Sequence, residues 1–310
     1  MPLTPALSRK RERECPCSLQ ADKTLNPHYH PPMKMRTVLI KKTWMAMVMA
    51  GALSACSTWQ PAPLSTEAWL QQIAQQPMPA VLLLGEQHDA TAHHQWEQRT
   101  VQTLAQRGQL AAVVLEMADD GHSTQALPAT ATEAEVQQAL QWNDKGWPWK
   151  HYGPTVMTAV RAGVPVFGGN LPRAQMQAVM QQAEWDSHLP PAAWQRQREA
   201  IRSGHCDLLP EAQITPMARI QLAKDARMAH TLEQQLQPGK TVLLIAGRGH
   251  VLRSVGVPAW LPAETSRTIA IAQAGDQPVA DAADSDHVVR TPAVPHKDHC
   301  AALRKQWNQP

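Results

Sequence analysis

The sequence has little net charge, few cysteines and no apolar run in its N-terminal part that could cross a membrane as a helix. The formal charge is +3 over 310 residues. Residues 1–55 contain nine basic but only three acidic side chains, which leaves 20 basic and 23 acidic side chains from Cys56 onward. The main part of the chain is therefore slightly acidic, which argues against a nucleic-acid partner.

The apolar run at 43–52 is too short for a membrane-spanning helix, but it has the length of the apolar region of a signal peptide. A basic segment precedes it, and it ends in Leu53-Ser54-Ala55-Cys56, which resembles a bacterial lipobox. We expect residues 35–55 to be a lipoprotein signal peptide and Cys56 to carry the lipid. Ser57, in place of Asp, favours anchoring to the outer membrane. We expect the anchored protein to face the periplasm. The alternative is a buried structural cysteine.

Residues 1–34 do not have the pattern of a signal peptide and resemble a translated intergenic repeat. We expect translation to begin at Met35, so the Cys15 and Cys17 pair is not interpreted as a metal site. With Cys56 lipidated, only Cys206 and Cys300 remain. In an oxidising compartment these two are expected to form a disulfide, and two free thiols are the alternative.

Short apolar runs alternate with helical patterns in the rest of the chain. The runs lie at 80–84, 111–115, 164–167 and 241–246, with a weaker one at 268–272. Helices are expected at 67–75, 95–107, 133–142, 153–162, 173–184, 191–202 and 215–236. This alternation predicts one α/β domain at 79–275, with a mostly parallel central sheet flanked by helices. Residues 56–78 are expected to be a tether, and 276–310 a flexible C-terminal segment.

Histidines and carboxylates follow the predicted strands. Glu86 and His88 come after the first strand, Glu116 after the second, and His250 after the fourth. Gly85 and Gly247 each begin a Gly-x-x-His sequence, and Asn170 follows the third strand. Because parallel strands end at the same edge of a sheet, these side chains should converge on one crevice. Two imidazoles and two carboxylates could bind a divalent metal ion or perform acid–base chemistry.

Seven motifs in order make the chain similar to the ChaN family of haem-binding lipoproteins. They are G-E-x-H-D at 85–89, L-E-M at 115–117, W-x-x-Y-x-P at 149–154, G-x-N-x-P-R at 168–173, G-H-C-x-x-L-P at 204–210, Q-x-A-x-D-x-x-M-A at 221–229 and G-x-G-H-V at 247–251. That family is similar to the Tiki/TraB and erythromycin-esterase-like group, which includes hydrolases.

The resemblance implies a haem-binding protein of haem or iron uptake, in which a tyrosine ligates the iron. It also implies stacked haems held between two protomers, so a haem-dependent homodimer is expected. Tyr152 is the only tyrosine after the leader and lies in the matching motif. A phenolate suits ferric iron. The expected haem-binding residues are Tyr152, His88, His250, Glu86, Glu116, Asn170 and Arg173. A packed aromatic is the alternative role of Tyr152.

Two other functions remain open at this point. One is a metal-dependent hydrolase that uses Glu86, His88, Glu116 and His250, with a divalent metal ion as cofactor and Tyr152 only structural. The other is a binding module for a different small molecule in the same crevice.

Overall fold

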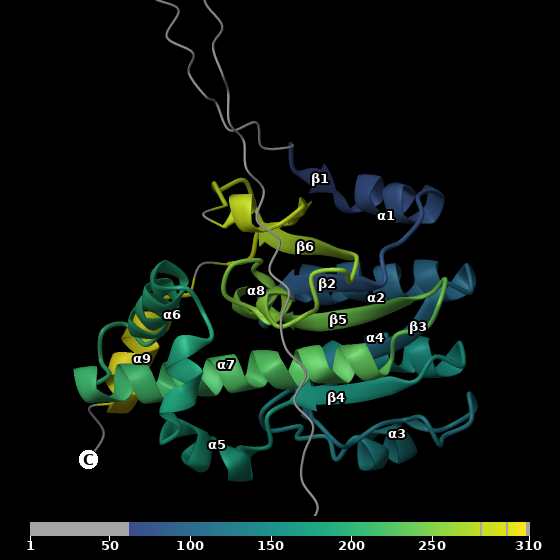
Figure 1. Cartoon of the computed structure of the whole chain (residues 1–310). Helices are drawn as coiled ribbons and strands as arrows, with labels where there is room; N and C mark the ends of the chain where they lie inside the picture. Colours follow the sequence, from purple (N-terminus) through teal and green to yellow (C-terminus); the bar gives the residue numbers. More distant parts are fainter. Residues whose placement is uncertain (1–61, 280, 296, 308–310) are drawn as a thin grey trace, which may run out of the picture. The chain divides into compact units, whose positions relative to one another are not determined.

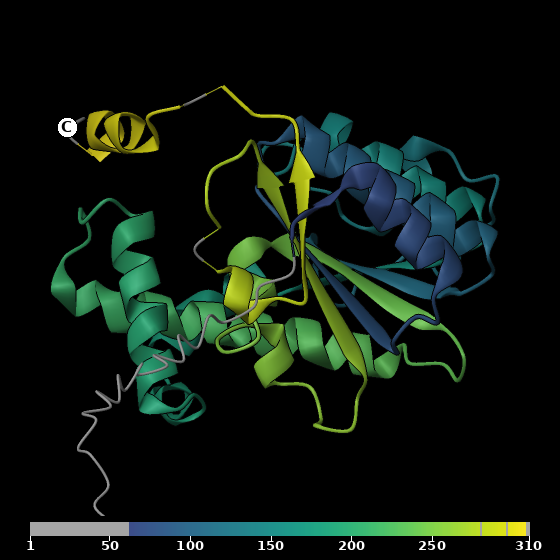
Figure 2. The same ribbon diagram turned by 90° about the horizontal axis from the view of Figure 1, so that it is seen from above.

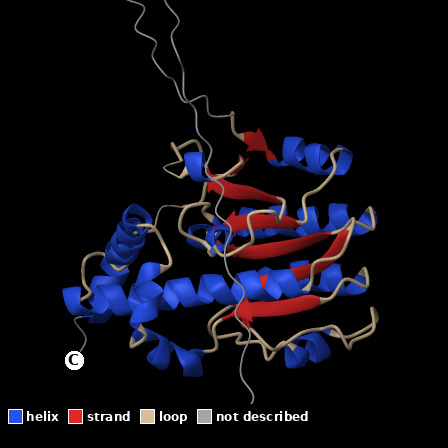
Figure 3. Ribbon diagram, viewed as in Figure 1, coloured by secondary structure: helices blue, strands red, loops and turns tan. Residues whose placement is uncertain are grey.

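The computed structural model describes residues 62–279, 281–295 and 297–307. The expected extension 1–34, signal peptide 35–55 and lipid site Cys56 lie outside these residues. The described chain forms a sheet with helices on both faces (Figure 3). The strands are β1 (Leu64–Ser65), β2 (Val81–Glu86), β3 (Leu110–Asp119), β4 (Val166–Asn170), β5 (Thr241–Gly247), β6 (Arg267–Ala274) and β7 (His287–Thr291).

The strand order is β1-β7-β6-β2-β5-β3-β4, and every neighbouring pair is parallel (Figure 1). The predicted α/β class with a parallel central sheet is confirmed. All five apolar runs became strands, because runs of this kind can be buried on both faces of a sheet. In β2, for example, all six residues are buried.

The helices are α1 (Thr66–Gln75), α2 (Thr91–Gln106), α3 (Glu133–Ala139), α4 (Trp149–Arg161), α5 (Arg173–Met180), α6 (Pro191–Gly204), α7 (Glu211–Gln234), α8 (Arg248–Val251) and α9 (His299–Trp307). Short 3-10 helices lie between these elements: η1 (Ala183–Ser187), η2 (Val257–Ala259) and η3 (Ala282–Asp284). None of the described helices is long and apolar enough to cross a membrane.

The core forms two apolar layers, one on each face of the sheet. On one face, α1, α2, α3 and α4 pack against the strands through residues such as Trp96 and Val156. On the other face, α7 and α8 pack through residues such as Met228 and Val251. Figure 2 shows α1 and α2 on one side of the strands and α7 on the other. Alternate side chains of each strand point to opposite layers, as the pleat of a strand requires.

The predicted start of α7 was wrong. The Thr215-Pro216 pair resembles a helix start, but the helix begins at Glu211 and contains Pro216. Ile214 lies before this pair and is fully buried beside Ile201 of α6. Burial of the first turn of α7 against α6 therefore outweighs the local cap signal and the loss of one backbone donor at Pro216.

The sheet extends beyond the predicted domain 79–275 on both sides. Strand β1 lies in the segment expected to be a tether, and β7 lies in the segment 276–310 that was expected to be flexible. Strand β7 has only three buried residues and its ends are polar, so no continuous apolar run marks it. Cys206 and Cys300 are joined by a disulfide, which ties α9 to the end of α6.

Both outer strands of the sheet are short or covered. Strand β1 has only two residues. The free side of β4 is occupied by residues 122–124: the Val166 N–H donates to Thr124 Oγ1 at 2.9 Å, and the Gly168 N–H donates to the His122 carbonyl at 2.9 Å. The outward N–H groups of Val166 and Gly168 are therefore satisfied by this segment.

Candidate functional site

The predicted histidines and glutamates converge at the carboxyl ends of the strands. Glu86 is the last residue of β2, Glu116 lies near the end of β3, and His250 lies in α8, directly after β5. His88 lies between the two glutamates: its Nδ1 is 2.7 Å from Glu86 Oε1 and its Nε2 is 3.7 Å from Glu116 Oε2. The sequence prediction that these four side chains share one edge of the sheet agrees with these distances.

Glu86 is a buried carboxylate that three side chains surround. Its Oε1 accepts hydrogen bonds from His88 Nδ1 and, at 2.9 Å, from the Tyr152 hydroxyl. His94 Nε2 lies 3.1 Å from Glu86 Oε2, but the two atoms are not aligned for a hydrogen bond. Because an ionised carboxylate can only accept, the proton of the first bond lies on His88 Nδ1. Glu86 therefore fixes the orientation of the His88 ring through this hydrogen bond.

Glu116 is the second buried carboxylate of the site. Its Oε2 accepts the backbone N–H of Gly247 at 2.9 Å, and its Oε1 lies 3.2 Å from His250 Nε2. Lys224 Nζ lies 3.6 Å from the same oxygen. A Cβ atom at position 247 would lie 2.7 Å from His88 Nε2, so only glycine leaves room for the His88 ring there.

Asp225 of α7 completes a row of alternating acids and bases, at 2.6 Å from His250 Nδ1. We call this row the relay row: Glu86, His88, Glu116, His250 and Asp225. Asp225, Lys224 and His94 were not predicted as site residues, because they lie on helices and do not follow strands. The Q-x-A-x-D motif at 221–229 contains Asp225 and was the available signal.

Burial and the neighbouring charges shift the pKa values of the relay row. Burial alone would raise the pKa of Glu86, but His88 and His94 outweigh it and lower this pKa to about 2. Burial likewise opposes ionisation of Glu116, yet His250 and Lys224 hold its pKa well below the usual range. Burial would lower the pKa of His250, but the charges of Glu116 and Asp225 raise it to about 10.

The other two groups of the row are shifted upward. Burial raises the pKa of Asp225 to about 6, although His250 works against this shift. Burial would lower the pKa of His88, but the hydrogen bond to Glu86 and the charge of Glu116 raise it. Glu116 and His250 thus form a buried ion pair, and His88 is the member of the row that reaches the surface, with 37% of its side chain exposed.

Tyr152 lies behind the relay row and not in the open crevice. Only 2% of the residue is exposed. Its ring lies among Trp142, Trp147 and His94, with ring centroids 4.9 to 6.0 Å away. Burial and the charge of Glu86 raise the pKa of its hydroxyl above the usual range. In this arrangement the Tyr152 oxygen is a hydrogen-bond donor and is not presented to a ligand.

Asn170 and Arg173 lie at the same end of the sheet but do not join the relay row. Asn170 ends β4 and is buried, and its Oδ1 has no hydrogen-bond partner among the described residues. Arg173 begins α5 and is exposed. Within the described part of the chain, no hydrogen bond or ion pair joins either side chain to Glu86, His88, Glu116 or His250.

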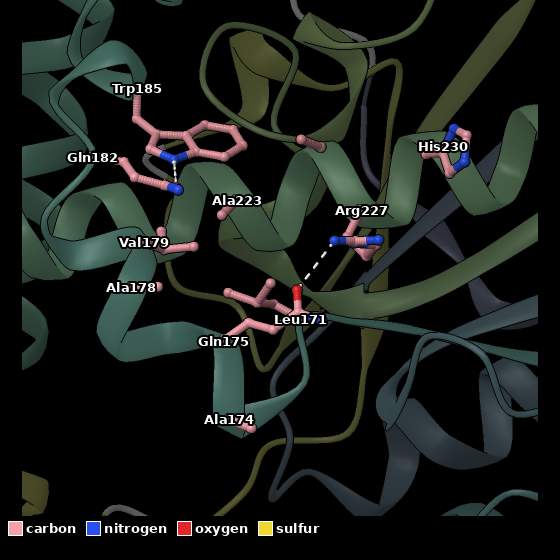
Figure 4. A pocket seen from close by; sticks show the side chains of 11 residues that line it. Leu171, Ala174, Gln175, Ala178, Val179, Gln182, Trp185, Ala223, Arg227 and His230 are labelled. Carbon is pink, nitrogen blue, oxygen red and sulfur yellow. Dashed lines mark hydrogen bonds between the residues drawn. The ribbon is translucent and has the colours of Figure 1, made fainter.

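A cavity of about 950 Å³ opens over His88, and we call it the crevice. Residues after β2, β6 and β7 line it: Gln87, His88, Asp89, 274–277, 293–295 and 297–299. A second cavity, of about 490 Å³, lies between α5 and α7 (Figure 4). Leu171, Val179 and Ala223 line it, and Arg227 and Gln175 are hydrogen-bonded beside it. His88 of the relay row lines the crevice, and His250 lines a smaller cavity of about 350 Å³.

The described residues contain no group of three or more His, Cys, Asp or Glu side chains arranged to hold a metal ion. The distances explain this result. The oxygens of Glu86 and Glu116 and both nitrogens of His250 already lie within hydrogen-bond or ion-pair distance of other side chains or of the Gly247 N–H. The polar atoms of the relay row are thus used mainly within the row itself.

Comparison with known proteins identifies relatives of this chain. A solved structure of ChaN from Campylobacter jejuni, described as showing cofacial haem binding, is similar over 73% of this chain and 94% of that chain, with 24% sequence identity and a TM-score of 0.60. The type III effector HopBA1 matches 76% of this chain and 97% of that chain, with 12% identity and a TM-score of 0.43. No curated protein matches.

Residues 69–261, which are more than half of the chain, match the family described as "Haem-binding uptake, Tiki superfamily, ChaN". The matched range contains the whole relay row and Tyr152. The resemblance predicted from the motifs is confirmed, and so is haem as the cofactor that this family implies. The chain belongs to the ChaN family of haem-binding uptake proteins in the Tiki superfamily.

Proposed function

We propose that this protein binds haem in the crevice and takes part in haem or iron uptake. Membership of the family supports the ligand class. The crevice volume of about 950 Å³ is within the range of sites that enclose a molecule of this size. When bound, haem would supply a ferric iron that a protein side chain can ligate, and two carboxylates that favour basic partners.

The observation that supports this site most directly is the environment of His88. Its Nδ1 is held by Glu86, and its Nε2 lies 3.7 Å from the nearest carboxylate oxygen, which is beyond hydrogen-bond distance. A histidine that donates one ring N–H to a carboxylate while the other nitrogen faces the metal is a common arrangement at protein metal sites. His88 also lines the crevice. We therefore propose His88 as the residue that meets the iron.

Ligation through Tyr152 stays a prediction. It would require the hydroxyl to leave Glu86 and to become a phenolate that reaches the crevice. In the arrangement described above, the hydroxyl instead holds Glu86 and thereby positions His88. We assign this positioning role to Tyr152.

The experiment is a titration of the protein with ferric haem, followed by the Soret absorption band. Wild-type protein should shift the band, and His88→Ala should weaken binding at least tenfold. Tyr152→Phe should retain binding. His230→Ala is the matched control, since His230 is exposed on α7 and lies away from the crevice.

Each other outcome has a defined meaning. If Tyr152→Phe abolishes a high-spin tyrosinate spectrum and His88→Ala preserves it, the iron ligand is Tyr152. Absence of any band shift with the wild-type protein would refute haem binding.

We also propose that the protein is attached to the outer membrane through a lipid on Cys56, facing the periplasm. The support is the order of basic segment, apolar run and lipobox in the sequence. In cells that are fed labelled palmitate and express the full chain, the wild-type protein should become labelled. The Cys56→Ser variant should not. A haem-dependent homodimer is proposed as well, and sedimentation with and without haem tests it.

A hydrolase is the second candidate, because His88 and Glu86 form a hydrogen-bonded pair beside an open cavity. In that case His88 acts as general base, with Glu86, Glu116 and His250 in support. Stoichiometric zinc or manganese binding that His88→Ala and His250→Ala remove, without haem binding, would favour a metal-dependent hydrolase.

A further inference from the structure

The chain after β7 passes along the mouth of the crevice. Figure 2 shows this segment leaving the end of β7 and running outward to α9. We call residues 292–295 and 297–299 the strap. Of these, 293–295 and 297–299 line the crevice together with His88. The strap is therefore one wall of the cavity, and the loops after β2 and β6 form the other.

Both ends of the strap are fixed to the rest of the domain. At its start, the Gly275 N–H donates to the Thr291 carbonyl at 3.0 Å, at the end of the β6–β7 pairing. At its end, Cys300 is bonded to Cys206, which lies 94 residues earlier in the chain. Without the disulfide, the chain beyond β7 would lose this covalent tie to the region after α6.

The strap also contacts the residue next to His88. Lys297 Nζ lies 3.0 Å from Asp89 Oδ2, and both side chains are at least half exposed. Exposed pairs of this kind contribute little to stability. Lys297 can therefore leave Asp89 and bind an anionic ligand group with little loss of stability.

We propose that the strap is a ligand-binding wall that the Cys206–Cys300 disulfide holds in place, with Lys297 as the contact for a carboxylate of the bound haem. Val294 and Pro295 offer apolar surface to a flat ring, while Lys297 supplies positive charge at the same wall. A wall that is fixed before binding loses less conformational entropy when the ligand arrives, which raises affinity. This inference rests on the proposed haem binding.

The test measures the dissociation constant and the dissociation rate of ferric haem with the full chain. The Cys206→Ser, Cys300→Ser double variant should bind about tenfold more weakly, mainly through faster dissociation. Lys297→Ala should bind about three- to tenfold more weakly. Lys297→Arg should restore binding, because it keeps the charge. Lys240→Ala is the matched control, since Lys240 is exposed in the turn before β5.

The outcomes separate the strap from the proposed function. If the variants keep the Soret band shape of the wild type but have a larger dissociation constant, the strap acts as a wall of the site. If the double variant and Lys297→Ala bind haem with the affinity and the dissociation rate of the wild type, the strap is not a ligand-binding wall. Haem binding itself would stand. A wild-type protein that binds no haem overturns both. Far-ultraviolet circular dichroism of each variant shows that the domain is folded in every comparison.

Discussion

The Tyr152 hydroxyl donates a hydrogen bond to Glu86 Oε1 at 2.9 Å from a position where the tyrosine is almost completely buried. The same oxygen accepts the hydrogen bond from His88 Nδ1. The position of the exposed histidine is therefore linked, through one carboxylate oxygen, to a buried aromatic cluster. In this arrangement Tyr152 supports the position of His88 through Glu86.

The first prediction concerns the free energy of this hydrogen bond. Tyr152→Phe keeps the ring among its aromatic neighbours but removes one donor from a buried carboxylate. A hydrogen bond to a charged group contributes about 1.5–3 kcal/mol, so urea unfolding should show a loss of stability of this size. An unchanged unfolding midpoint would mean that Glu86 does not depend on Tyr152.

The second prediction concerns Gly247. Gly247→Ala places a Cβ atom 2.7 Å from His88 Nε2 and 3.4 Å from Glu116 Oε2. The side chains must shift, so we expect a fall in stability of about 1–3 kcal/mol and at least a tenfold loss of haem affinity. Gly249→Ala is the control, because a Cβ atom there meets nothing within 4 Å. Equal behaviour of the two variants would show that the close approach at position 247 has no role.

The third prediction concerns the pH dependence of stability from His250. The groups around it are Glu116, Asp225, Lys224 and His88. Its pKa is raised from 6.5 to about 10 in the folded protein, after the neighbouring carboxylates outweigh burial. A raised pKa means that this contribution is fully present below about pH 6.5 and is lost as the pH rises toward 10.

The wild-type protein should therefore lose a few kcal/mol of stability between about pH 7 and pH 10, since one pKa unit corresponds to about 1.4 kcal/mol. His250→Asn should be less stable at pH 7 and show a flatter profile over this range. His230→Asn, at an exposed position on α7, should leave the slope as it is in the wild type. Urea unfolding at four pH values measures all three, and a wild-type slope that survives in His250→Asn would contradict the assignment.

The fourth prediction concerns Glu97, a fully buried carboxyl group on α2. Neither of its oxygens has a hydrogen-bond partner among the described residues. Burial and the charge of Glu86 raise its pKa well above the usual range, so it is neutral in the folded protein near neutral pH. The stability that this shift contributes is present below about pH 4.5 and is lost as the pH rises.

Glu97→Gln should therefore stabilise the protein at pH 8 by about 1 kcal/mol or more, with a smaller gain at pH 5. Glu86→Gln is the informative comparison, because Glu86 is ionised and its loss should destabilise the protein at both pH values. If Glu97→Gln and Glu86→Gln change the free energy of unfolding equally, the Glu97 carboxyl group is not neutral in the folded protein.

The central strands and the convergence of the site could be predicted, because both follow from local sequence. Continuous apolar runs mark strands buried on two faces, and the residues that follow parallel strands meet at one edge. The sequence prediction did not specify which carboxylate pairs with which histidine; the structure pairs His88 with Glu86 and His250 with Glu116. Strands β1 and β7 were missed, since a two-residue strand and a strand with polar ends give no such run.

The supporting residues could not be predicted by the same reasoning. Asp225 reaches the relay row from the middle of α7, and His94 reaches it from the first turn of α2. The packing of these two helices against the sheet brings both side chains there. The burial of Tyr152 depends on where Trp142 and Trp147 lie, and these residues come from the segment before α4. A tyrosine near a helix start can face the crevice or the core, and the sequence does not distinguish the two.

The margins of the sheet restrict how copies of this protein can associate. One margin is a strand of two residues, and the other already has its backbone groups bonded to residues 122–124. Exposed long edge strands are the usual template for joining two sheets into one, and within the described residues neither margin offers one. A homodimer of this chain would therefore form through side-chain surfaces, such as helices or the two crevice mouths, and each protomer would keep its own separate sheet.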